Sequence, residues 1–140
     1  MQTQNTETTG YNELMINQAL QETRRKLGLV PSELEDVRRR MNKALKHESN
    51  DRGAVVSWLQ WYEVQATYEP LNAATLTEAR EYLGLDQDEL ALVCGFKESK
   101  HRHQHISRME SNRREITSTM SRLIRSFLAG YRSPDWPNQT

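Results

Sequence analysis

An internal repeat of a helix–glycine–helix pattern restricts this chain to a narrow set of folds. The segment LQETRRKLGLVPSELEDV (residues 20–37) aligns without gaps on LTEAREYLGLDQDELALV (residues 76–93), and nine of the eighteen positions are identical. In both copies apolar residues recur every three or four positions, as in an amphipathic helix, and a central Leu-Gly-Leu interrupts that period. The repeat therefore predicts two related helical units.

The rest of the chain favours the same fold class. No sustained alternation of apolar and polar residues marks a β-strand, and the breaks between periodic segments are glycines and prolines. We predict an all-α protein with four regions. These are a disordered Thr/Gln/Asn-rich N-terminus over residues 1–10, a helical domain over 11–73, a second helical domain over 74–131, and a tail over 132–140.

Local helix signals are strongest in the second copy of the repeat. Thr75 and Glu78 have the spacing of a capping box, and so do Asp86 and Glu89 at the start of the next helix. Gly84 is placed to end the first of these helices. The residues expected to face the core are Leu90, Ala91, Val93, Cys94, Met120, Leu123, Ile124, Phe127 and Leu128.

Charge is segregated along the chain although the formal net charge is zero. Residues 75–96 contain one basic and five acidic side chains, whereas residues 97–132 contain nine basic and three acidic ones. A local excess of positive charge on one element is the electrostatic pattern of a nucleic-acid-binding surface.

Cysteine content and hydropathy predict an intracellular protein. Cys94 is the single cysteine, so no intrachain disulfide can form. No apolar run approaches the length of a membrane span, and the polar first ten residues lack the apolar core of a signal peptide. We expect a soluble, cytoplasmic protein with no membrane partner.

The segment LTEAREYLGLDQDELALVCGF, followed by ISRMESNRR, resembles the XRE/Cro-CI family of helix-turn-helix regulators. The resemblance covers residues 74–131 and implies a lambda-repressor-like helix-turn-helix bundle. In such a bundle a scaffold helix and a glycine turn precede a recognition helix that enters the major groove. The expected function is that of a sequence-specific transcriptional regulator, most consistent with a repressor, that binds a double-stranded DNA operator as a homodimer. Gly95 supplies the turn glycine, and Ile106 and Met109 are expected to face inward from the recognition helix.

One departure from the family pattern lies between the two motif halves. The inward aliphatic residue of the recognition helix usually falls six positions after the turn glycine, which here is His101; Ile106 comes five residues later. Either the turn is a longer basic loop or the recognition helix begins early and gains more than a turn. We favour the early-starting helix.

Two groups of side chains follow as candidate DNA contacts. Arginine and glutamine can bond base edges in bidentate fashion, and cations at the two ends of a recognition helix neutralise phosphates. The predicted base-contacting residues are Arg102, His103, Gln104, His105, Ser107 and Arg108. The predicted phosphate-contacting residues are Gln87, Lys97, Lys100, Asn112, Arg113 and Arg114, with Gln87 taken from the resemblance.

Enzymatic and metal-binding functions find little support. His101, His103 and His105 are spaced by two residues, so on a helix their side chains diverge instead of converging on one ion. No glycine-rich phosphate loop, nucleophile–base pairing or carboxylate dyad is present. We predict no metal site, no cofactor and no catalytic residues.

The first copy of the repeat matches the family more weakly. It lacks the second glycine turn, and VVSWLQWYEVQ would stand in place of ISRMESNRR, with Val56 equivalent to Ile106. Its aromatic residues suit packing better than groove reading, so we favour a degenerate copy used for packing or dimerisation; a second DNA reader stays open. A rival hypothesis is an antitoxin-like regulator whose N-terminal half binds a protein partner through Trp58, Trp61, Tyr62 and Tyr68.

Overall fold

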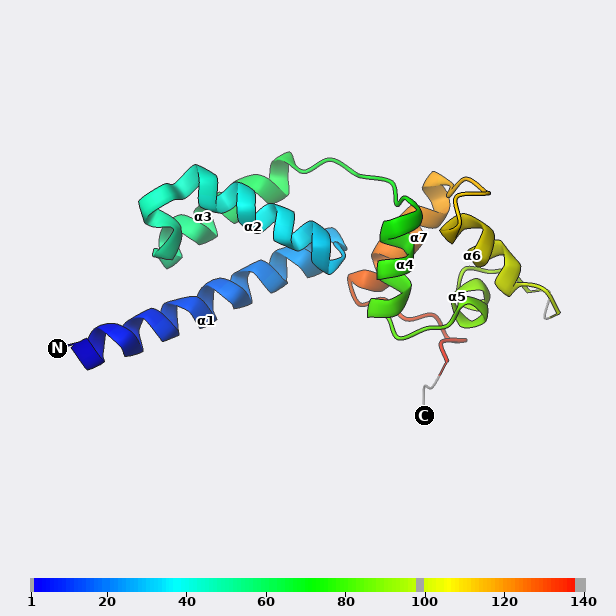
Figure 1. The fold of residues 1–140 in the computed structure, drawn as a ribbon, viewed down its shortest axis with the longest axis horizontal. Coiled ribbons are helices and arrows are strands. Elements are labelled where there is room, and N and C mark those ends of the chain that lie inside the picture. Colours follow the sequence, from blue (N-terminus) through cyan, green and yellow to red (C-terminus); the bar gives the residue numbers. More distant parts are fainter. Residues whose placement is uncertain (1, 98–99, 138–140) are drawn as a thin grey trace. The chain divides into compact units, whose positions relative to one another are not determined.

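A computed structural model describes residues 2–97 and 100–137, and within these ranges the chain is helical and forms no strand (Figure 1). It divides into two compact units, residues 1–67 and 68–140. The first unit holds α1 (Gln2–Leu27), α2 (Pro31–Leu45), the short 3-10 helix η1 (Lys46–Asn50) and α3 (Arg52–Gln65). The second holds α4 (Ala73–Tyr82), α5 (Gln87–Val93), α6 (His103–Glu110) and α7 (Ser118–Leu128). Within the described residues, no helix combines the length and apolar character needed to cross a membrane.

Two predicted boundaries differ from the structure. Helix α1 begins at Gln2, where disorder was expected over residues 1–10, because a nucleated helix extends readily through a segment without proline. The units divide after residue 67 instead of 73, because the segment before α4 is bonded to α7. The backbone N–H of Leu71 donates to Ser121 Oγ (3.1 Å), and Arg125 Nε donates to the backbone carbonyl of Glu69 (2.8 Å).

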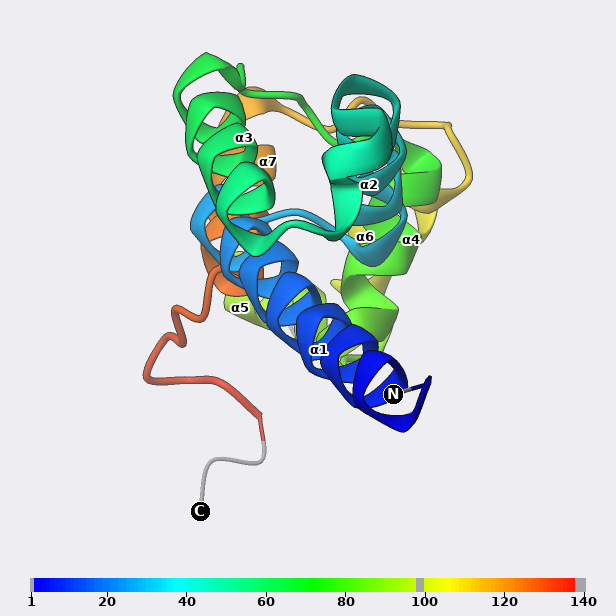
Figure 2. The same cartoon turned by 90° about the vertical axis from the view of Figure 1, so that its left-hand side faces the viewer.

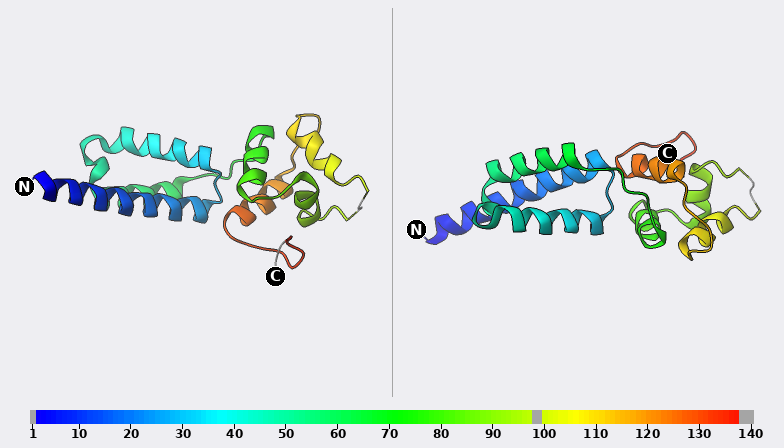
Figure 3. Two further views of the ribbon diagram at one scale, coloured as in Figure 1. Left: turned by 60° about the horizontal axis from the view of Figure 1, so that its bottom comes forward. Right: turned by 90° about the horizontal axis from the view of Figure 1, so that it is seen from above.

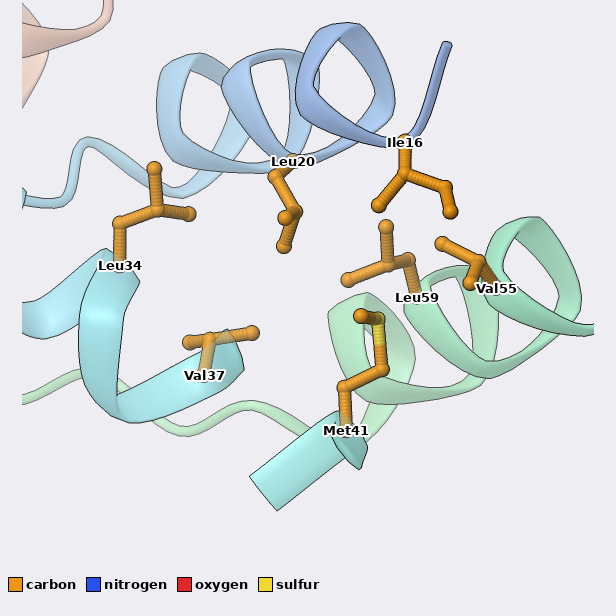
Figure 4. Close-up of a cluster of buried hydrophobic side chains, with 7 residues drawn as sticks. All are labelled: Ile16, Leu20, Leu34, Val37, Met41, Val55 and Leu59. Carbon is orange, nitrogen blue, oxygen red and sulfur yellow. The ribbon is translucent and has the colours of Figure 1, made fainter. Parts of the chain in front are cut away.

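The first unit is a bundle in which three helices run side by side (Figure 3), and an end-on view places them at the corners of a triangle (Figure 2). Their inward faces meet in one apolar cluster (Figure 4). Each member is at most 6% exposed; the cluster consists of Ile16, Leu20, Leu34, Val37, Met41, Val55 and Leu59. Burial of this shared stripe is the main stabilising contribution to the unit.

Both copies of the internal repeat form the same helix–glycine–helix corner. Gly28 and Gly84 have positive φ angles of 63° and 72°, which end α1 and α4. The next residue in each copy donates its N–H to the carbonyl of an arginine five residues back, Leu29 to Arg24 (3.0 Å) and Leu85 to Arg80 (3.2 Å).

The side chains of the corner repeat as well. Arg80 Nη1 donates to the Leu85 carbonyl at 3.1 Å, and Arg24 Nη1 donates to the Leu29 carbonyl at 3.5 Å. In the second helix of each copy, a glutamate side chain accepts a hydrogen bond from the backbone N–H of the N-cap residue. Glu89 accepts from Asp86 at 2.9 Å, and Glu33 accepts from Val30 at 3.0 Å. The repeat predicted from sequence is thus confirmed at the level of individual hydrogen bonds.

Beyond the corner the two copies diverge. Helix α2 continues for 15 residues, whereas α5 ends after seven and Gly95, with φ 95°, turns the chain away. Helix α3 then packs mainly along α1, while α6 packs mainly on α5. The proposed equivalence of Val56 with Ile106 is wrong, because Val55 occupies the fully buried position of α3 and Val56 is half-buried.

Capping in the second unit is partly as predicted. Asp86 and Glu89 form the predicted capping box, with the Glu89 N–H donating to Asp86 Oδ1 at 2.7 Å. The predicted box of Thr75 with Glu78 is wrong. Helix α4 begins one turn earlier, and Asn72 is its N-cap, bonded reciprocally to Thr75. Asparagine is among the strongest N-cap residues, and the buried neighbour Leu71 fixes where the chain enters the helix.

The predicted core of the second unit is largely confirmed. Buried as expected are Leu90, Ala91, Val93, Met120, Ile124, Phe127 and Leu128, while Cys94 and Leu123 are half-buried. Desolvation by burial raises the pKa of the Cys94 thiol to about 12, so it stays protonated near neutral pH and packs as a small apolar side chain. The tail folds back locally, and the Trp136 ring lies edge-on to Phe127 at 5.0 Å between centroids.

Candidate nucleic-acid interface

The candidate interface is built on α6, an eight-residue helix with one buried and one basic face. Ile106 and Met109 are 0% and 2% exposed, so the predicted inward pair is confirmed. Ala91 of α5 is fully buried, and its small side chain permits the close packing of α5 against α6. The opposite face of α6 carries the exposed side chain of Arg108.

Helix α6 begins at His103, so the favoured early start of this helix is wrong. Lys100, His101 and Arg102 form a turn, Lys97 has no regular structure, and Glu98 and Ser99 lie outside the described residues. The turn after α5 is closed by the Phe96 N–H, which donates to the Ala91 carbonyl at 3.0 Å. Of the predicted base-contacting residues, Arg102 therefore precedes the helix.

An ion pair fixes the position at which α6 begins. Arg102 donates to both carboxylate oxygens of Asp88 in the first turn of α5, through Nε at 2.7 Å and Nη2 at 2.9 Å. The hydrogen bond from Arg102 holds the pKa of Asp88 below its ordinary value. The side chain of Arg102, the N-cap residue of α6, makes no capping hydrogen bond. The bidentate pair of Arg102 and Asp88 therefore holds the start of α6 against the first turn of α5.

We expect Asp88→Asn to loosen the start of α6 while leaving the unit folded. Because the Asp88 carboxylate is 42% exposed, its ion pair contributes little to global stability, and the melting temperature should change little. Hydrogen exchange at the Gln104 and His105 amides should quicken severalfold, because these amides bond to the carbonyls of His101 and Arg102. Glu81→Gln, an exposed charge removal on α4, is the matched control. Unchanged exchange in Asp88→Asn would show that the ion pair does not hold this end of α6.

A second polar cluster fixes the C-terminal end of α6. The Glu110 carboxylate accepts from Arg80 Nε at 3.1 Å to each oxygen and from Gln87 Nε2 at 2.8 Å. The Glu110 and Arg80 side chains are 8% and 18% exposed. Burial disfavours the charged form of Glu110, but hydrogen bonds from Gln87, Thr77 and Arg80 outweigh it, and its pKa is lowered. Helices α4, α5 and α6 are therefore joined at one carboxylate.

This cluster changes the interpretation of Gln87. The resemblance assigned its side chain to a backbone phosphate, yet its amide is bonded to Glu110. Gln87 thus positions α6 in this structure.

Two predicted contact residues, His105 of α6 and Arg114 beyond its end, lie against each other. The His105 ring stacks on Phe96, with centroids 4.2 Å apart and planes inclined by 14°. The Arg114 guanidinium lies 5.6 Å from the Phe96 centroid, and its Nη1 contacts His105 Nδ1. Phe96 therefore holds an imidazole and a guanidinium together at the edge of the helix.

The remaining predicted residues surround the outward face of α6. His103, Arg108, Asn112 and Arg113 are exposed, as are Lys97 and Lys100 in the loop, whereas Gln104 and Ser107 are half-buried. Gln104 Oε1 accepts from Arg108 Nη2 at 3.4 Å. Asn112, with φ 64°, turns the chain after the helix. Among the described carboxylates, none lies within ion-pair distance of Lys97, Lys100, Arg108 or Arg113.

The histidines are dispersed in keeping with their spacing. His101 and His103 are exposed, whereas His105 is stacked on Phe96. Within the residues that the structure describes, no three His, Cys, Asp or Glu side chains gather in a way that could hold a metal ion.

Four residues that shape this interface were not predicted from the sequence, namely Arg80, Asp88, Phe96 and Glu110. Arg80 and Glu110 carried one available signal, since each follows a core-facing residue, Leu76 or Ile106, by four positions and so shares its helix face. Nothing in the sequence indicated the stacking of Phe96 with His105. Comparison of the chain with protein-family models, with curated proteins and with solved structures finds no match.

Proposed function

We propose that this chain is a sequence-specific transcriptional regulator, acting as a repressor, that reads the major groove of double-stranded DNA with α6. Helices α5 and α6 then correspond to the two helices of a lambda-repressor-like helix-turn-helix. The observation that supports this most strongly is the division of charge around α6. The carboxylates of Asp88 and Glu110 are used to hold its two ends, while the outward cations have no described carboxylate partner. A rigid helix with uncommitted cations suits a polyanion.

Most of the predicted contact residues keep a chemical role in this proposal. Arg108 and Gln104 are neighbours on α6 and offer bidentate donors and acceptors to base edges. Lys97, Lys100 and Arg113 neutralise phosphates on either side of the groove. His103 and Ser107 are further base-facing donors, while His105 and Arg114 form a stacked pair at the helix edge. Arg102 and Gln87 are reassigned to positioning.

The proposal requires two copies of the chain at the operator. One recognition helix reads only a few base pairs, so affinity and specificity come from two helices in successive major grooves. Occupancy of such a site blocks transcription without any catalytic step, so we propose neither an enzyme nor a cofactor.

The N-terminal unit is proposed to serve packing and dimerisation instead of reading DNA. Its third helix packs along α1, and its exposed residues include Trp61 and Val64, which suit no groove contact. The antitoxin-like alternative keeps some support from Trp61, which is 56% exposed. The four aromatics do not form one exposed patch, however. Trp58 and Tyr62 pack against the core of the first unit, and Tyr68 belongs to the second, where its hydroxyl donates to the Ser118 carbonyl at 2.9 Å.

Selection of bound fragments from random duplex DNA tests the proposal directly. We expect enrichment of one motif with two related half-sites separated by about one helical turn. Two chains should occupy one footprint that spans both half-sites. Recovery of fragments with no shared motif would refute sequence-specific recognition. One chain covering both half-sites would refute the dimer and favour two readers in a single chain.

A further inference from the structure

The outer face of α3 carries an apolar surface with a rigid backing. Trp61 and Val64 lie about one helical turn apart and are 56% and 80% exposed. The Trp58 ring stacks with Tyr62 at 5.3 Å between centroids and lies 5.9 Å from Trp61. Because Trp58 and Tyr62 pack against the core of the unit, Trp61 rests on an ordered base. A fixed, half-exposed tryptophan is the kind of side chain that anchors protein interfaces.

This surface is also uncharged. Helix α3 contains two charged residues, Arg52 at its first position and Glu63 near its end. The Glu63 carboxylate is directed toward α1, where it accepts from Thr23 Oγ1 at 2.6 Å and pairs with Lys26 at 3.6 Å. The exposed polar residues around Trp61 and Val64 are the neutral Ser57, Gln60 and Gln65.

The exposed face of α3 around Trp61 and Val64 is uncharged, whereas the exposed face of its neighbour α2 is charged. The exposed face of α2 carries Arg39 and Arg40, which pair with Asp36. A two-fold symmetric contact brings identical residues together, so an α2 face docked on its own copy would desolvate these ion pairs and bring like charges close to one another. An uncharged face meets its own copy without that penalty, and it offers nothing for a strongly charged partner to complement.

We infer that the outer face of α3 is the surface on which a second copy of this chain docks, with Trp61 and Val64 of each copy packed across a two-fold axis. This inference rests on the proposed function, because the α3 contact is the one that would pair two DNA-binding units. The association itself takes place without DNA and is measured without it.

Sedimentation of the full chain over a concentration series, without DNA, tests this surface. Trp61→Glu places a charge at the centre of the two-fold contact and should raise the dimer dissociation constant at least about thirtyfold. Leu14→Glu is the matched control, because Leu14 is 55% exposed on α1 and lies outside the α3 face. That variant should dimerise like the unmodified chain.

Val64→Glu provides an independent variant that leaves the Trp58–Trp61 contact intact. Far-ultraviolet circular dichroism and melting temperature verify that the variants fold, which we expect because both positions are exposed. A full chain that stays monomeric at every concentration overturns the inference. So does a dimer that neither Trp61→Glu nor Val64→Glu weakens, since the contact would then lie elsewhere.

Failure of this inference is distinguishable from failure of the proposed function. If both α3 variants dissociate the dimer but the unmodified chain binds no DNA, the docking surface stands and the regulator proposal falls. If the chain selects a DNA motif but binds it as a monomer, with the α3 variants equal to wild type, the regulator proposal stands and the docking surface falls.

Discussion

Replacing Glu110 with glutamine is expected to lower the free energy of unfolding of the C-terminal unit by about 3 kcal/mol. The substitution keeps the volume of the side chain but removes the negative charge that Arg80 and Gln87 share. Arg80 is only 18% exposed, so its guanidinium is left poorly solvated without a counter-ion. Urea denaturation followed by circular dichroism measures the loss, with the transition of the second unit analysed separately.

Glu81→Gln is the matched control for this prediction. It makes the same chemical change in the same unit, at an exposed position on α4, and should alter the free energy of unfolding by no more than about 0.5 kcal/mol. A Glu110 variant as stable as this control would show that the cluster joining α4, α5 and α6 does not stabilise the unit.

The effect of Glu110 should also depend on pH. Its pKa in the folded state is lowered from an ordinary value of 4.5, so its stabilisation is fully present above that value. The stabilisation is lost as the pH falls through the lowered folded-state pKa, because the protonated carboxyl no longer balances Arg80. The stability difference between wild type and Glu110→Gln should therefore be constant near neutral pH and shrink below pH 4.5.

Arg108→Ala is expected to reduce sequence discrimination at one base pair. Arg108 is exposed on α6, bonded to Gln104 and free of any described carboxylate partner, so its guanidinium is available to a base edge. Its removal should cost about 1–3 kcal/mol of discrimination at one base pair, and Gln104→Ala a similar amount at one position. Fluorescence anisotropy with the selected operator and single-base variants measures both effects.

Arg113→Ala is the matched control, because Arg113 is also exposed but lies beyond the end of α6. It should weaken binding to all duplexes by a similar factor and leave the preference among bases unchanged. If Arg108→Ala behaved in the same way as Arg113→Ala, Arg108 would be a phosphate contact and the reading face of α6 would lie elsewhere.

Helix ends and caps that depend only on residues within one turn could be predicted from the sequence. Gly84 and Gly95 both adopt the positive φ that ends their helices, and the Asp86–Glu89 capping box is present, because these features are decided within one turn. The start of α4 was not predictable in the same way. Asn72–Thr75 and Thr75–Glu78 both have cap-like spacing, and the choice follows from burial of Leu71 within the second unit.

The candidate site was predictable in outline but not in the role of each residue. The basic segment and the inward pair of Ile106 and Met109 follow from composition and period. The role of Arg102 does not, because its partner Asp88 lies 14 residues earlier on another helix and only the folded chain brings them together. The same holds for Gln87, whose amide is bonded to Glu110, 23 residues away.

Binding of the full chain to its selected operator across a range of salt concentrations tests the proposed DNA recognition most directly. We predict that the logarithm of the association constant falls linearly with the logarithm of salt concentration, by about 0.9 for each phosphate contacted. For a dimer that uses Lys97, Lys100 and Arg113 of both chains, the slope should be about −5 or steeper. An affinity that does not change with salt, or the absence of affinity for any duplex, would contradict a DNA-binding function.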